Sequence, residues 1–208
     1  MVETQIKFAV ICHHSRMDHA SRLAEMLGED CVLFIDHADS GANANHRRAL
    51  EWAAEQDGRV VVLEDDAQPV EGFTSLVTEW LVRFPDNLIS FYLGTGRPPQ
   101  YQMQIAERLV IADKNRDDFI TMPRLIHGVC YSVPQHYLSR VLARWDSNKA
   151  ADYAVGDACG GLVVYPCYSL VEHADGEPVE QHPDGAPRTE RRRAWRLALS
   201  LEENQCRP

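Results

Sequence analysis

The sequence predicts a mixed α/β domain in which a mostly parallel sheet is flanked by helices. Short apolar runs rich in β-branched residues recur along the chain, segments with apolar residues at helical spacing separate them, and several of the apolar runs end in polar or acidic stretches. Strands that alternate with helices favour a layered parallel sheet, whose ligands bind at the carboxyl ends of the strands. Functional residues are therefore expected directly after the predicted strands.

The first half of the chain supplies most of this alternation. Each predicted strand is a short, mainly apolar run, and each predicted helix carries apolar residues three and four positions apart. The predicted elements are a strand at 5–12, a loop at 13–16, a helix at 17–28, a strand at 31–36, a polar loop, a helix with Ala49, Leu50, Ala53 and Ala54 inward, a strand at 59–69, a helix at 72–84, a strand at 88–94 and a loop at 95–100.

The second half is less regular and ends in a basic stretch. Residues 1–175 are expected to form one domain, and 176–208 a mobile loop and a basic helix packed on that domain. The mobile segment is predicted at 174–188, which is rich in Gly, Pro and acids. The remaining predicted elements are strands at 127–133 and 161–166, a helix from Pro134 to about Trp145, a short helix at 150–158, and a helix near 189–202 with Ala194, Leu197, Ala198 and Leu201 inward.

The composition is that of an ordinary folded domain. Hydrophobic residues make up 45% and charged residues 25% of the 208 positions, and a chain of this length can fold around a single core. The six cysteines form no CxxC pair, which favours neither a disulfide framework nor a zinc site. Apolar runs are shorter than the ~18 residues of a membrane span, and the first residues lack a signal-peptide pattern. A cytoplasmic protein is expected.

Charge is distributed unevenly along the chain. The formal net charge is −10, but residues 186–208 carry six arginines against three acids. That segment is therefore about +3 and the remainder −13. Because binding of a polyanion is driven by basic groups, the acidic body is unsuited to it without a bound cation.

Three acids follow the apolar residues Val60–Leu63. Glu64, Asp65 and Asp66 are thus presented together at the end of a buried strand. Like charges so close raise one another's proton affinity unless a cation is present, and Mg²⁺ and Mn²⁺ prefer oxygen ligands of this kind. The alternative is that the acids are solvated and cap the following helix.

Four motifs resemble the GT-A class of nucleotide-sugar glycosyltransferases, in the order of that family. VVLEDDAQPVEGF looks like its DxD motif, HGVCYSVP like its glycine loop, AADYAVG like its catalytic-base segment, and CYSLVEHADG like its PSLVxH segment. The resemblance covers most of residues 5–175 and extends to small phage-encoded enzymes. It implies a GT-A-like, Rossmann-like fold in which Glu64, Asp66 and His173 hold Mn²⁺ or Mg²⁺ and Gly128 lies against the donor sugar.

The resemblance also implies a donor site and a catalytic base. The donor is expected to be a nucleotide-sugar, with a UDP-sugar favoured. Asp152 is the expected base, and Asp157 is the alternative; on a helix the two point some 140° apart, so only one faces the acceptor. Whether the reaction inverts or retains the anomeric carbon is left open. The residues expected around the nucleotide and its diphosphate are His13, Ser15, Arg16, Asp36, Arg47 and Asp65.

Two other classes of function and several acceptors compete with this interpretation. A nucleotidyltransferase would use the same acids but would more often show a glycine-rich loop after the first strand. A sugar-nucleotide or carbohydrate-binding module would need neither base nor metal. Five arginines surround Trp195 in residues 188–196, a pattern suited to a phosphate backbone with an aromatic ring for stacking. The resemblance to phage-encoded enzymes implies a hydroxymethylated base in DNA as the leading acceptor, with a glycan, protein or small molecule as alternatives. No oligomeric state is predicted.

Overall fold

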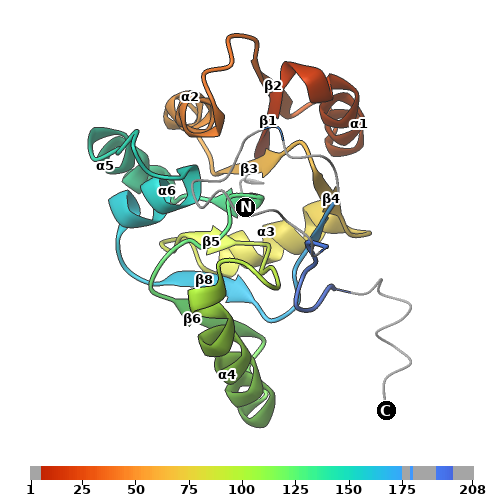
Figure 1. Cartoon of the computed structure of the whole chain (residues 1–208), viewed down its shortest axis with the longest axis vertical. Helices are drawn as coiled ribbons and strands as arrows, with labels where there is room; N and C mark the ends of the chain where they lie inside the picture. Colours follow the sequence, from red (N-terminus) through yellow and green to blue (C-terminus); the bar gives the residue numbers. More distant parts are fainter. Residues whose placement is uncertain (1–5, 175–178, 180–190, 199–208) are drawn as a thin grey trace.

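The computed structural model describes residues 6–174, residue 179 and residues 191–198. The strands of its main sheet are β1 (Lys7–His13), β2 (Cys31–Asp36), β3 (Val60–Glu64), β5 (Ile89–Ser90), β6 (Phe119–Met122), β7 (Cys130–Ser132) and β8 (Val163–Pro166), in the order β2-β1-β3-β7-β5-β8-β6. β7 and β6 run against the other five strands. The mixed, mostly parallel sheet predicted from the sequence is thus confirmed (Figure 1).

Helices cover both faces of the sheet and give a Rossmann-like, three-layered architecture (Figure 1). The helices are α1 (Met17–Leu27), α2 (Ala42–Ala54), α3 (Phe73–Arg83), α4 (Pro99–Asn115), α5 (Leu138–Ala143) and α6 (Ala151–Cys159), with 3-10 turns η1 (His14–Arg16) and η2 (Gln135–Tyr137). α2, α4, α5 and α6 bury side chains in one core cluster, and α1 and α3 do so in the other. Along β1, Ala9 and Ile11 face the first cluster while Phe8 and Val10 face the second. A strand buried on both faces explains its continuous apolar run.

Two short strands form a separate, antiparallel sheet beside the carboxyl edge of the main one. β4 (Ala67–Pro69) pairs with β9 (Val171–His173), and their register sets Ala67 opposite His173. The sequence predicted no strand at 171–173 and treated 59–69 as one strand. The turn at the three acids divides that segment into β3 and β4.

Other elements differ from those expected in ways that the side chains explain. α2 begins at Ala42, inside the stretch expected to be a polar loop. α4 and β6 were not predicted at all. α4 buries only a narrow stripe, while Met103, Val110 and Ile111 remain exposed, so its apolar residues are spread around the helix and give no clear amphipathic pattern.

The prediction of a helix near 189–202 is wrong for the part that the structure describes. Residues 191–198 lie along two loops instead, with isolated bridges from Ala194 to Gly94 and from Leu197 to Ser169. Their backbone groups find partners in these loops rather than within a helical turn. Most of the segment predicted to be mobile, 174–188, falls outside the described residues.

Among the residues that the structure describes, no helix has both the length and the apolar character that crossing a bilayer would require.

Arg59 joins several elements at the edge of the sheet opposite the carboxyl ends. The residue is 9% exposed and directly precedes β3. Its guanidinium donates to the backbone carbonyls of Phe84, Pro85, Asn87 and Ser132 at 2.7–3.2 Å, and its Nε donates to the Ser132 hydroxyl at 3.1 Å. Burial lowers the pKa of Arg59 to about 10. The side chain thus ties β3 and β7 to the end of α3 and the start of β5.

We expect Arg59→Lys to lower the free energy of unfolding by about 2–4 kcal/mol. An ammonium group cannot reproduce the planar fork, and each buried acceptor left without a donor costs about 1–3 kcal/mol. Urea unfolding followed by circular dichroism measures the change. The exposed Arg144 offers a matched control, since Arg144→Lys should stay within about 0.5 kcal/mol of the wild type. Equal stability of the two variants would contradict the role given to Arg59.

Candidate functional site

Three chain segments meet at the carboxyl edge of the main sheet. β3 ends there at Glu64, the antiparallel β7 begins there just after Gly128, and β9 brings His173 there by pairing with β4. The backbone N–H of Ala174 donates to the carbonyl of Asp66 at 2.8 Å. Backbone pairing therefore places residues far apart in sequence side by side.

Glu64, Asp66 and His173 lie close enough to share one ion. Each offers a ligand atom, and these atoms all lie within 4.8 Å of one another. His173 Nε2 is 3.5 Å from Asp66 Oδ2, and its Nδ1 is 2.7 Å from the carbonyl oxygen of Ala174. Because that carbonyl can only accept, Nδ1 carries a proton and donates it. In the neutral ring, Nε2 then points a lone pair toward Asp66, which is the tautomer that a metal ligand needs.

The donor set fits a divalent cation. Asp66 Oδ1 is buried and has no hydrogen-bond partner in the part of the chain that the structure describes. A carboxylate oxygen in that position is costly, and a bound cation would satisfy it. Two carboxylates and one imidazole match the preferences of Mn²⁺ and Mg²⁺, which complete their shell with water or phosphate oxygens. We therefore regard the Glu64–Asp66–His173 group as the candidate metal site.

Arg16 lies beside two of the acids. Its Nη1 is 3.1 Å from both Asp65 Oδ1 and Asp66 Oδ2, and both carboxylates are buried. Burial, followed by the charge of Asp66, raises the pKa of Asp65 to about 6 even though Arg16 acts in the other direction. Burial and the charge of Glu64 also raise the pKa of Asp66, against the cationic influence of Arg192 among others. The arginines reduce the repulsion between the carboxylates without removing it.

Glu64 is held in place by a buried histidine. His46 Nε2 lies 3.3 Å from Glu64 Oε1, and its Nδ1 lies 2.9 Å from the hydroxyl of Tyr131. Burial alone would raise the pKa of Glu64, but the hydrogen bond from His46 and nearby positive charge lower it below its ordinary value. A Cβ on Gly128 would come within 2.8 Å of Glu64 Oε1, so the glycine keeps room for this carboxylate.

The two candidate bases lie on different faces of α6. Asp152 is in the first helical turn, and burial followed by the charge of Glu64 raises its pKa to about 7 despite a hydrogen bond from the Tyr153 N–H. Asp157 lies at the surface, where it pairs with Arg124 at 2.8 Å and with Lys149 at 2.9 Å. Only Asp152 shares the electrostatic environment of the acidic site.

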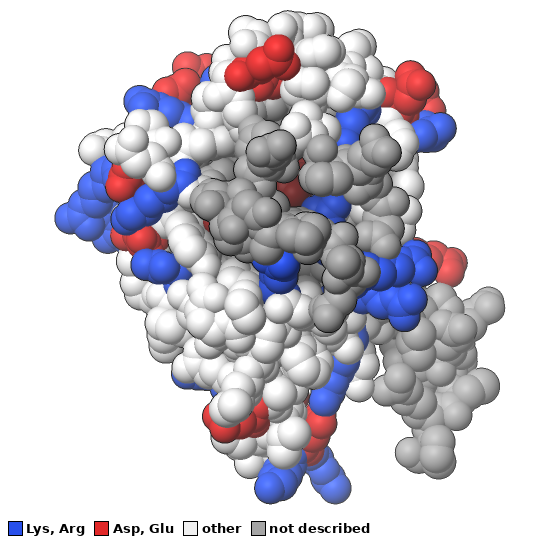
Figure 2. Space-filling view, viewed as in Figure 1, with Lys and Arg blue, Asp and Glu red and all other residues white. Residues whose placement is uncertain are grey.

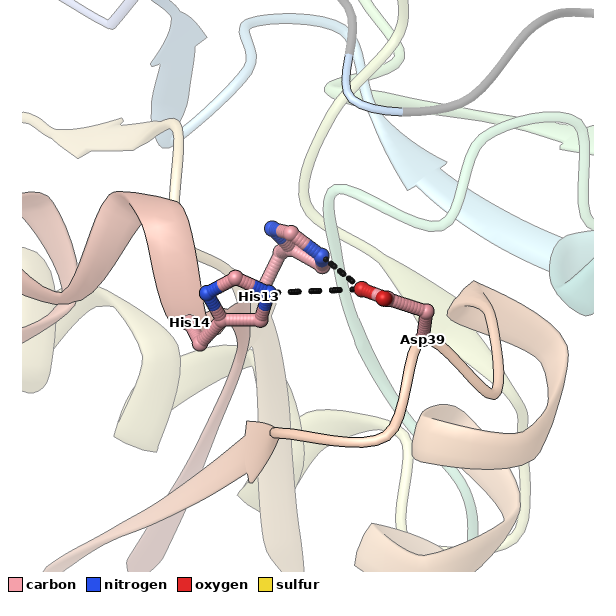
Figure 3. Close-up of side chains that lie close together, drawn as sticks. All are labelled: His13, His14 and Asp39. Carbon is pink, nitrogen blue, oxygen red and sulfur yellow. Dashed lines mark hydrogen bonds and ion pairs between the residues drawn. The ribbon is translucent and has the colours of Figure 1, made fainter.

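The residues expected around the nucleotide do not form one cluster. Asp36 is buried and accepts backbone hydrogen bonds from residues 38, 40 and 41, so it shapes a turn. Arg47 is exposed and pairs with Glu51 on α2. His13 Nδ1 and the Ser15 hydroxyl are hydrogen-bonded at 2.7 Å. His13 also lies next to Asp39 (Figure 3).

Sequence reasoning missed two histidines of the site, the buried His46 and the half-buried His127. His46 lies on the helical face of α2 that carries Ala49 and Leu50, a position that should have indicated burial. His127 directly precedes Gly128, and its Nε2 donates to the carbonyl of Arg97 at 2.9 Å. Its Nδ1 is buried with no partner among the described residues, and burial lowers its pKa to about 4, so the ring is neutral.

The basic segment makes contacts within the protein that the DNA hypothesis did not anticipate. Trp195 packs against the core and donates from Nε1 to Gln102 at 3.0 Å, so its ring is not free for stacking on a base. Arg196 forms two hydrogen bonds with Asp113 at 2.6 and 2.7 Å. Arg191 and Arg193 are exposed. On the face shown in Figure 2, basic and acidic side chains are interspersed.

The fold and the site define an α/β protein with an acidic group, completed by a histidine, at the carboxyl edge of its sheet. No protein-family model and no curated protein matches the chain. Among solved structures the chain is similar to A197 from STIV, with a TM-score of 0.50 and 9% identity over 93% of this chain and 96% of that one. At this identity the likeness shows the fold alone.

We expect Asp152→Asn to stabilise the protein at pH 8. Since the pKa of Asp152 rises from 3.8 to about 7 on folding, the folded chain binds more protons than the unfolded chain between those values. The carboxyl group therefore costs stability as the pH rises through this window. The variant should melt roughly 5 °C above the wild type at pH 8, and the gap should close near pH 4.

Asp157→Asn is the matched control on the same helix. It loses the ion pairs with Arg124 and Lys149, so its melting temperature should equal or fall below that of the wild type at pH 8. Differential scanning calorimetry at the two pH values measures both variants. A melting temperature for Asp152→Asn that stays at or below the wild-type value at pH 8 would show that Asp152 is not a buried, high-pKa carboxyl.

Proposed function

We propose that this protein is a metal-dependent glycosyltransferase that moves a sugar from a nucleotide-sugar, with a UDP-sugar as the favoured donor, to an acceptor hydroxyl. One observation carries the proposal: Glu64, Asp66 and His173 converge with a buried, unpartnered oxygen at the carboxyl edge of the sheet. Gly128, which the motif resemblance assigns to the sugar, lies against Glu64, and the charge of Glu64 acts on Asp152, which the resemblance assigns to the base. The α/β fold agrees with the resemblance.

The residues around the acids are suited to a diphosphate leaving group. When bound at Glu64, Asp66 and His173, a divalent ion supplies Lewis-acid stabilisation of the charge that develops on phosphate oxygen. Arg16 contacts Asp65 and Asp66, and the charge of Arg192 acts on Glu64 and Asp66. Both guanidinium groups are proposed to face the diphosphate, because a cation beside the ion neutralises further charge.

Two neutral groups are proposed to orient the donor sugar. Gly128 leaves space against Glu64, and His127 keeps a lone pair on Nδ1. Since the Nε2 proton is committed to Arg97, Nδ1 can only accept, which suits a sugar hydroxyl. Ser15, exposed on the turn before α1, is proposed to lie on the nucleotide side of Arg16.

Asp152 is proposed to accept the proton of the attacking hydroxyl. A carboxyl with a pKa near 7 is deprotonated in useful amounts at neutral pH yet is a stronger base than an ordinary aspartate. Direct attack assisted by this base would invert the anomeric carbon. The surface position of Asp157 and its two ion pairs favour Asp152 over it.

We expect Mn²⁺-dependent release of nucleoside diphosphate when the protein is screened against nucleotide-sugars. Asp66→Ala should lower turnover by at least ~10³-fold, because it removes the central metal ligand while leaving the core unchanged. Chelator should abolish the wild-type activity, and coupled detection of nucleoside diphosphate measures both effects.

Arg47→Ala is the control for this experiment. Arg47 is exposed, and among the interactions described it pairs only with Glu51. The variant should turn over at close to the wild-type rate. A non-catalytic binding module would release nothing with any donor, and a nucleotidyltransferase would release pyrophosphate from a nucleoside triphosphate instead. Wild-type turnover by Asp66→Ala would refute the metal assignment.

We expect transfer by the wild type to increase with pH through about pH 7, as Asp152 loses its proton. Asp152→Asn should lower transfer by at least ~10²-fold and lose this pH limb, while titration with Mn²⁺ and donor still shows binding. Asp157→Asn should keep both the wild-type rate of transfer and its increase with pH. A dead Asp157→Asn together with an active Asp152→Asn would move the base assignment to Asp157.

Modified DNA stays the leading hypothesis for the acceptor. It rests on the arginines of 188–196, of which Arg193 is exposed, while Trp195 and Arg196 contact Gln102 and Asp113 within the protein. Hydroxymethylated and unmodified duplexes, offered with labelled donor beside glycan, protein and small-molecule acceptors, distinguish the acceptor classes. Label on hydroxymethylated duplex alone would support DNA, and label elsewhere would exclude it.

A further inference from the structure

We propose that His13, His14 and Asp39 form a second metal site, which selects a borderline transition-metal ion such as Zn²⁺ over Mg²⁺ and Mn²⁺. The three side chains come from the end of β1, from η1 and from the loop between β2 and α2, and they converge at the protein surface (Figure 3). This inference does not rest on the proposed function, because its three ligands are not among the residues proposed there to hold the metal or to act as the base.

Both imidazoles point at the same carboxylate oxygen. Asp39 Oδ1 lies 2.7 Å from His13 Nε2 and 3.3 Å from His14 Nε2. The two rings lie 4.0 Å apart, centre to centre. Ligand atoms of a tetrahedral zinc ion with bonds of ~2.0–2.1 Å lie roughly 3.3 Å from one another. The distance between Asp39 Oδ1 and His14 Nε2 already equals this value. The distance between Asp39 Oδ1 and His13 Nε2 would have to increase by about 0.6 Å.

Ser15 sets the tautomer of His13 in the absence of an ion. Its hydroxyl lies 2.7 Å from His13 Nδ1, and its backbone N–H donates to the same nitrogen at 3.2 Å. Nδ1 is therefore an acceptor, and Nε2 carries the proton and donates it to Asp39. An ion on Nε2 displaces that proton; the ring is then protonated on Nδ1, where the Ser15 hydroxyl oxygen accepts and the Ser15 N–H gives up its acceptor. A partner of this kind on the outer nitrogen is what orients a metal-binding imidazole.

The loop that carries Asp39 is fixed before any ion binds. Asp36 accepts hydrogen bonds from the N–H groups of Ala38, Ser40 and Gly41 at 2.8–3.1 Å. Asp39 itself adopts φ +52°, a left-handed conformation that non-glycine residues seldom take. Asp36 thus builds a turn that projects Asp39 at the two histidines, which reduces the ordering needed on binding.

The chemistry of the ligands separates this site from the acidic one. Two imidazoles and one carboxylate suit Zn²⁺, Co²⁺ or Ni²⁺, whereas Glu64, Asp66 and His173 offer mainly oxygen. Asp39 is 74% exposed at its side chain, so solvent can reach the cluster and supply a fourth ligand. An ion there would fasten the loop at 37–41 to the end of β1.

The test uses the full chain carrying His173→Ala, so that the acidic site lacks its imidazole. Isothermal titration with Zn²⁺ should give one site per chain, and Co²⁺ should develop the visible absorption of a four-coordinate ion. His13→Ala, His14→Ala and Asp39→Asn in this background should each lower Zn²⁺ affinity at least ~30-fold, and Ser15→Ala about 10-fold. Melting temperatures without metal confirm that each variant folds.

His37→Ala and His136→Ala are the matched controls, because both histidines are surface residues outside the cluster. They should bind Zn²⁺ as tightly as the parent. Mn²⁺ at the same concentration should leave the cluster empty, as judged by an unaltered Zn²⁺ titration. Unchanged Zn²⁺ affinity in His13→Ala and Asp39→Asn, or equal losses in the two controls, would overturn the proposal.

Discussion

Three consecutive carboxylates at the end of a buried strand impose the constraint on which the site depends. Glu64, Asp65 and Asp66 cannot all stay ionised so close together without positive charge or hydrogen-bond donors nearby. The fold answers with Arg16 from the turn after β1 and with two histidines, His46 from α2 and His173 from β9. Among the described residues, Oδ1 of Asp66 still has no hydrogen-bond partner. A pure stability requirement would favour apolar residues there, so this arrangement points to a ligand.

Local pattern accounts for much of what the sequence predicted correctly. The apolar run before the acids predicts a strand, and the acids themselves are adjacent, so the edge on which they lie follows from the parallel sheet alone. The expectation that His173 belongs to the site came from a motif resemblance. Its placement beside Asp66 depends on the pairing of β4 with β9, two strands of three residues each that carry almost no pattern of their own.

The remaining parts depend on tertiary contacts that a single sequence does not display. In the sequence, His46 is one more polar residue in a polar stretch. Only the folded structure places Tyr131 and Glu64 at its two ring nitrogens. The stretch at 191–198 has the periodicity of an amphipathic helix, yet its backbone groups bond to loops near Gly94 and Ser169. In both cases partners more than 15 residues away outweigh the local preference.

The pairing of β4 with β9 also determines when the acidic site can exist during protein synthesis. Ala67 leaves the ribosome long before His173, to which it is paired in the finished fold. Until then a nascent chain presents the three acids without their last partner. The complete group of acids and histidine therefore forms only after the late strands have been made, however early the first strands emerge.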